Sequence, residues 1–209
     1  MMMNKKLNSN NQTSFWNVIL IMVFLIALFY ISRDLEHYGM KEETLGRFWN
    51  VKWWLICHLT TAIVAVILGP LQFWKWFRNR NIKLHRQLGK IYILSIIITS
   101  LCSSYLAWNT AIKIHFTWAL TLQVAAVIWI ITVLMAYRTA KLKRIQQHKE
   151  WMIRSYIVTM VFISFRFFND YFEAAQIGTF IERAATIGYL ATFLPLFLSE
   201  LVFQWNRKK

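Results

Sequence analysis

Four of the five histidines in this 209-residue chain form two pairs, each expected at the same depth in a membrane. His58 and His115 are expected toward the outer face, and His85 and His148 at the cytoplasmic edge. Imidazoles are common metal ligands, and two of them on facing helices can bind haem iron from both sides. The pairs therefore suggest b-type haem and electron transfer across the membrane. The Cys-x-x-Cys-His sequence that attaches haem covalently is absent, so the haem would be non-covalent.

The same region of the chain supports a second interpretation, in which positive charges around the inner histidines bind an anion. Such a rim could hold anionic lipid head groups or an anionic substrate, as in a transporter or a lipid-interacting protein without enzymatic activity. The rim would consist of Arg78, Arg80, His85, Arg86, His148, Lys149 and Arg154. In the plainest alternative, the histidines cap helices and the charges only set the topology. Motifs of serine hydrolases, phosphate-binding loops and zinc proteases are absent, which disfavours those chemistries.

A polar stripe is expected on the helix that follows His148. Residues 7, 11 and 18 positions apart share one face of an α-helix. His148 therefore shares its face with Ser155, Thr159 and Arg166. Asp170 extends the stripe and is placed to pair with Arg166 one turn earlier.

Other polar residues in the apolar segments are also expected to face protein, because polar groups are costly in lipid. Arg154 points away from the stripe, and its expected partner is Glu150. The expected polar core consists of Gln72, Tyr92, Thr159, Arg166 and Asp170.

The composition indicates what kind of elements position these residues. The chain is 57% hydrophobic and only 16% charged, with a mean hydropathy of +0.40, whereas soluble domains have about 25% charged residues. The apolar runs are about 17 to 22 residues long, which suits helices that cross a bilayer rather than the shorter strands of a barrel. The sequence thus predicts an all-α integral membrane protein, a bundle of six transmembrane helices over residues 15–31, 53–73, 88–108, 116–137, 151–168 and 185–203.

The charge distribution predicts the orientation of this bundle. The net charge is +15, and lysine and arginine gather at both termini and in the second and fourth connections. By the positive-inside rule, both termini are expected in the cytoplasm. The expected location is the inner membrane. Residues 1–14 and 206–209 would be short cytoplasmic tails around a transmembrane domain over 15–205. Membrane topology explains the positive charge better than nucleic-acid binding does. The expected partners are therefore membrane lipids, a quinone or redox partner, and further copies of the chain.

Three runs in the middle of the chain carry a family resemblance: Gly69–Phe73, His85–Tyr92 and His148–Tyr156. Together with His58, Arg78 and Arg166, they resemble an uncharacterised bacterial membrane family called domain of unknown function 2306, over roughly residues 50 to 170. The resemblance implies a multi-spanning membrane protein without an established activity, and His115 matches none of its motifs. The layout also loosely resembles two-haem b-type membrane cytochromes, which is an analogy at the level of the fold.

Overall fold

The computed structural model describes residues 22, 24–205 and 207. The chain divides into two compact units, residues 1–36 and 37–209. The described part of the first unit is helical over 24–34. Residues 15–21 and 23 of the predicted first span, 15–31, lie outside the described residues, and the rest of that span is helical. The tail 1–14 and most of the tail 206–209 also lie outside the described residues.

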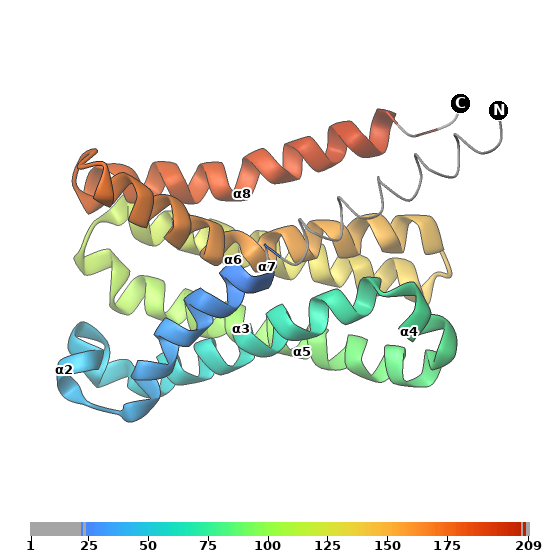
Figure 1. Ribbon diagram of the computed structural model, residues 1–209, viewed down its shortest axis with the longest axis horizontal. Helices are drawn as coiled ribbons and strands as arrows, with labels where there is room; N and C mark the ends of the chain where they lie inside the picture. Colours follow the sequence, from blue (N-terminus) through green and yellow to red (C-terminus); the bar gives the residue numbers. More distant parts are fainter. Residues whose placement is uncertain (1–21, 23, 206, 208–209) are drawn as a thin grey trace. The chain divides into compact units, whose positions relative to one another are not determined.

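Five long helices build the second unit (Figure 1): α3 Lys52–Phe73, α5 Ile82–Asn109, α6 Phe116–Lys141, α7 Ile145–Ala174 and α8 Phe180–Trp205. Each lies in a segment long and apolar enough to cross a membrane, and these five are the candidate spans in the described part of the chain. No strand occurs in that part either. The all-α membrane architecture is therefore confirmed, and five of the six predicted spans are found.

The helices extend beyond the predicted spans at most of their ends. The predicted connection between the spans 53–73 and 88–108 contains α4 Lys75–Arg80 and the first turns of α5. Asn81 starts α5, because its side-chain oxygen accepts a hydrogen bond from the Leu84 amide at 3.0 Å. His85 and His148 consequently lie inside helices rather than at their edges. Hydropathy marks the part of a helix in hydrocarbon, whereas the helix continues into the polar interface where charged side chains stay solvated.

Helices adjacent in sequence pack against each other from α3 to α8, and α3 also contacts α7 while α6 contacts α8. The contact between α3 and α7 depends on Gly69, where an added Cβ would overlap the Tyr156 ring. Small residues allow this kind of close approach in membrane bundles. The Tyr156 hydroxyl also donates to the Val66 carbonyl at 3.3 Å. The α3–α7 approach closes the bundle around a core that includes Tyr92 and Met152.

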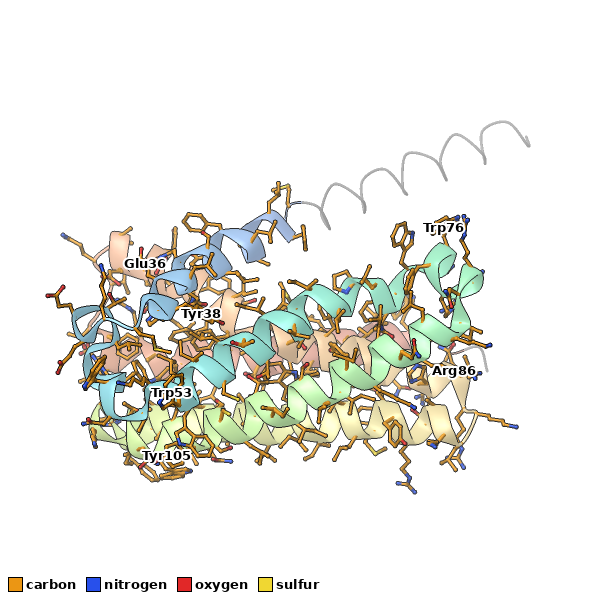
Figure 2. The ribbon with its side chains drawn as sticks, turned by 90° about the horizontal axis from the view of Figure 1, so that it is seen from below. Glu36, Tyr38, Trp53, Trp76, Arg86 and Tyr105 are labelled. Atoms are coloured by element: carbon orange, nitrogen blue, oxygen red, sulfur yellow. The ribbon has the colours of Figure 1, made fainter. Side chains whose placement is uncertain are left out.

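Cations gather at one end of the second unit, which we call the basic end and define as residues 75–90 and 138–149. Arg86 and Trp76 lie at this end, and Trp53 and Tyr105 lie toward the other (Figure 2). The charge pattern predicts that the basic end faces the cytoplasm.

The second unit also contains three short elements: α2 Glu42–Leu45, η2 Gly46–Val51 and η3 Ala111–Lys113. Another short helix, η1 Leu35–Gly39, precedes them in the chain.

Candidate functional site

A cavity of about 400 Å³ opens at the basic end, lined by residues of α3, α5, α6 and α7. His85 of α5 and His148 of α7 both line it. The two predicted inner histidines therefore come together in one cavity, which we call the His85–His148 pocket. Its size is in the range of ordinary small-molecule and cofactor sites.

The two imidazoles of the pocket have different surroundings. Nδ1 of His148 lies 2.9 Å from the carbonyl oxygen of Ala136 on α6. A carbonyl oxygen can only accept, so Nδ1 carries the proton and Nε2 of the neutral ring is left as an acceptor or a metal ligand. Nδ1 of His85 is buried and has no hydrogen-bond partner among the residues that the structure describes.

Gln72, near the end of α3, adds a buried amide to the pocket lining. The residue is only 7% exposed, and its Nε2 has no hydrogen-bond partner in the described part of the chain. Gly89 of α5 leaves room for this amide, since a Cβ there would lie 3.2 Å from the Oε1 atom of Gln72. A buried amide donor without an acceptor is uncommon and costs free energy.

Four exposed cations also line the pocket: Arg86, Lys90, Lys141 and Lys143, which we call the basic mouth. No acidic residue of the described chain lines the pocket with them. Apolar surface is contributed by Ile93, Tyr137 and Met152. The pocket thus combines positive charge, two imidazoles and one amide with an apolar wall.

A hydroxyl network lies in the bundle core, one turn along α5 from Gly89. The hydroxyl of the fully buried Tyr92 is 3.1 Å from both Ser155 Oγ and Thr159 Oγ1. Thr159 Oγ1 also accepts from Trp129 Nε1 at 3.0 Å and donates to the Ser155 carbonyl at 2.9 Å. The predicted polar stripe of α7 is therefore buried at these positions, and Tyr92 and Thr159 meet as members of one network.

The two predicted outer histidines occupy unlike surroundings. His58 lies between α3 and α5, with Nδ1 at 2.9 Å from Thr99 Oγ1 and 3.1 Å from the Thr99 carbonyl oxygen. His115 is exposed and caps α6, where its Nδ1 accepts from the Thr117 amide at 3.3 Å. His58 thus faces protein as predicted, and the structure gives His115 a capping role.

Arg154, predicted to belong to the cationic rim, lies between α7 and α8. Its guanidinium sits 4.7 Å from the ring centroid of Trp151 and 4.6 Å from that of Phe203. It forms a salt bridge with Glu200, and its predicted partner Glu150 is 4.0 Å away. The side chain holds two helices together and is not among those that line the pocket.

The remaining predicted site residues also lie outside the pocket lining. Arg78 is in α4 at the basic end. Arg166 lies on α7 with its guanidinium 4.7 Å from the Phe162 ring centroid. Asp170 is half-buried one turn further along the same helix, and its pairing with Arg166 stays a prediction.

Residues 55–203 match the model of the family DUF2306, which is described as a predicted membrane protein. The chain belongs to this family. The matched region runs from the start of α3 almost to the end of α8 and includes every residue that lines the pocket. The resemblance seen in the sequence is confirmed, and it extends over α8 as well. No curated protein and no solved structure matches the chain.

The sequence did not point to the lysines of the basic mouth as site residues. Lys141 ends α6 and Lys143 follows it, far from His85 along the chain. Both reach the pocket because α6 packs beside α5 and α7. A helix periodicity shows which residues share a face but not which neighbour that face meets. The sequence did contain one indication that this part of α6 packs closely against a neighbouring helix. Ala136 and Ala140 lie one turn apart on α6, and small residues favour close helix contacts.

Proposed function

We propose that the protein is a membrane redox protein that holds a b-type haem in the His85–His148 pocket. The observation that carries this proposal is that two imidazoles from different helices line one cavity. Haem iron bound by two histidines supplies one-electron transfer. Its electron partner would be a membrane quinone or another redox protein.

The residues present fit such a group. His148 has the Nδ1 hydrogen bond that orients metal-binding histidines and leaves Nε2 available. Ile93 and Met152 provide apolar surface for a porphyrin, and the basic mouth provides counter-charges for its carboxylates. Haem needs only two axial side chains, and within the described residues no group of three or more histidine, cysteine, aspartate or glutamate side chains could hold a metal ion.

Absorbance of the purified protein, produced with an adequate haem supply, tests the proposal. We expect a Soret band that is lost in His85→Ala and in His148→Ala. His115→Ala is the matched control and keeps the band, because this exposed residue caps α6. A colourless wild-type protein with intact helices would reject the haem proposal.

A second candidate is a non-enzymatic transporter or lipid-interacting protein. The basic mouth favours it, because four cations beside an apolar wall suit an anionic amphiphile as well as they suit haem. In this case the protein would be colourless, and lipid would co-purify in amounts that depend on residues of the pocket.

A further inference from the structure

We propose that the His85–His148 pocket recognises an oxyanion at the polar end of an amphiphilic ligand, with the Gln72 amide as its buried donor. The oxyanion is a carboxylate, as in the propionates of haem, or a phosphate, as in an anionic lipid. The inference rests on the pocket being a ligand site, but it does not require that the ligand contain iron.

The unpaired amide of Gln72 is the first observation behind the proposal. Its Nε2 is a donor only, lies in a residue that is 93% buried, and has no partner within the described chain. A leucine here would avoid that cost, and an acceptor on a bound ligand would satisfy the amide. The opposing Gly89 leaves space beside the amide where any Cβ would approach the Oε1 atom.

The basic mouth is the second and independent observation. Arg86 and Lys90 come from α5, Lys141 ends α6, and Lys143 follows it. No acidic side chain of the described residues balances them within the lining. All four side chains are exposed, so they attract an anion to the mouth of the pocket through a field that salt screens. An oxyanion would accept from the Gln72 amide and the cations together, as charge-assisted hydrogen bonds do.

The apolar wall makes the ligand an amphiphile rather than a free inorganic anion. Ile93, Tyr137 and Met152 line the same cavity as the cations. The cavity also lies among helices that are apolar enough to cross a membrane. A ligand that is anionic at one end and apolar at the other would satisfy both parts of the pocket.

Two experiments, one for each oxyanion, form the two arms of the test. The carboxylate arm compares the affinity of the protein for haem b with its affinity for haem b dimethyl ester, which lacks the two negative charges of the propionates. Each is titrated into the full-length protein in detergent and followed by absorbance. We expect the free acid to bind about tenfold tighter or more, as for hydrogen bonds to charged groups. Equal affinities would overturn the carboxylate assignment while leaving histidine ligation intact, so this failure differs from failure of the haem proposal.

The phosphate arm uses bilayer nanodiscs of phosphatidylglycerol or phosphatidylcholine and counts retained lipids by native mass spectrometry. We expect retention of phosphatidylglycerol but not of phosphatidylcholine, because the choline cation of phosphatidylcholine offsets the negative charge of the same phosphate group and is repelled by the basic mouth. A contrast in one arm alone assigns the oxyanion to carboxylate or to phosphate. This arm remains decisive when the protein binds no haem, which separates the inference from the proposed function.

Variants test whether either difference in binding (free acid against ester, or phosphatidylglycerol against phosphatidylcholine) depends on residues of the pocket. We call this difference the contrast. Gln72→Glu keeps the size of the side chain and adds a negative charge. Gln72→Leu removes the amide donor without adding a charge. Lys90→Gln/Lys141→Gln removes two charges of the basic mouth. The matched control, Lys75→Gln/Lys83→Gln, removes two exposed lysines of the basic end that do not line the pocket.

We expect the pocket variants to reduce the contrast to about threefold or less, and the control to preserve it. Size-exclusion profiles and helix content identify which variants fold, and Gln72→Leu keeps the test available if Gln72→Glu does not. The proposal is wrong if neither arm shows a contrast, or if the folded pocket variants and the control lower it equally.

Discussion

Buried polar side chains of this bundle differ in where their hydrogen bonds go. Thr121 and Thr139 donate to carbonyls of their own helix, which satisfies them locally. Tyr92 and His58 bond to a neighbouring helix instead. Gln72 keeps a nitrogen without a partner in the described chain, and this residue lines the pocket. Ser100 also has a buried hydroxyl without a partner in the described chain, but it does not line the pocket. A missing partner therefore points to a ligand contact only where the residue also lines a cavity.

The Tyr92 hydroxyl provides a stability prediction at this scale. Tyr92→Phe removes the group shared by Ser155 and Thr159. We expect a loss of about 1 kcal/mol in the free energy of unfolding, because one buried interaction is lost while Thr159 keeps its bond from Trp129. Denaturation of the detergent-solubilised protein measures the loss.

Tyr105→Phe is the control for this experiment, because Tyr105 is exposed and stacks on Trp54 through its ring. We expect this variant to unfold like the wild type. Equal destabilisation by the two substitutions would contradict the role given to the Tyr92 hydroxyl.

Sequence periodicity predicted much about single residues and little about their partners. It correctly gave His58 a protein-facing position and placed Ser155 and Thr159 on a buried face. It did not predict that His148 bonds to the Ala136 carbonyl, since every residue has a carbonyl and only packing selects one. It also predicted Arg154 for the rim, whereas the structure uses this residue between α7 and α8.

At the scale of elements, the helices meet through two unlike kinds of contact. α3 and α7 approach through Gly69, where the Tyr156 ring lies against the backbone. α7 and α8 are joined by Arg154, which pairs with Glu200 and lies over the Phe203 ring. The first contact depends on shape and the second on charge and aromatic surface.

Gly69→Ala tests the contact that depends on shape. The added methyl group would overlap the Tyr156 ring, so we expect a loss of about 1–3 kcal/mol in the free energy of unfolding. Gly39→Ala is the control, because nothing lies within 4 Å of a Cβ there. A second substitution, Tyr156→Ala, is expected to make Gly69→Ala much less costly. If the Gly69→Ala loss is unchanged in the Tyr156→Ala background, the overlap is not its cause.

At the scale of the whole molecule, hydropathy predicted the number of long helices found in the second unit but not their ends. Apolar runs define where hydrocarbon begins, and α5 and α7 start earlier, with His85 and His148 already in them. The pocket could not be predicted in full, because its lining comes from four helices whose order around the bundle is a property of packing. Charge still predicts which end of the molecule is cytoplasmic.

Cysteine labelling tests this orientation. Lys113→Cys places an exposed thiol at the end opposite the basic end, and Lys83→Cys places one within it. With a membrane-impermeant thiol reagent on intact cells, we expect Lys113→Cys to react and Lys83→Cys to react only after lysis. The wild type, whose Cys57 and Cys102 lie within α3 and α5, gives the background. The reverse pattern would invert the topology.

The helices on the two sides of the pocket are joined by connections of different length. Only the three residues 142–144 join α6 to α7, so the wall that carries Lys141 and His148 is tethered close to where the ligand would sit. On the other wall, Gln72 of α3 and His85 of α5 are connected through the longer segment 74–81, which contains α4 and the Asn81 cap. The short connection restrains α6 and α7 directly, whereas α3 and α5, on either side of α4, are held by their own packing. We therefore expect insertions in the 142–144 connection to disturb the pocket more than insertions next to α4, as measured by the loss of ligand binding.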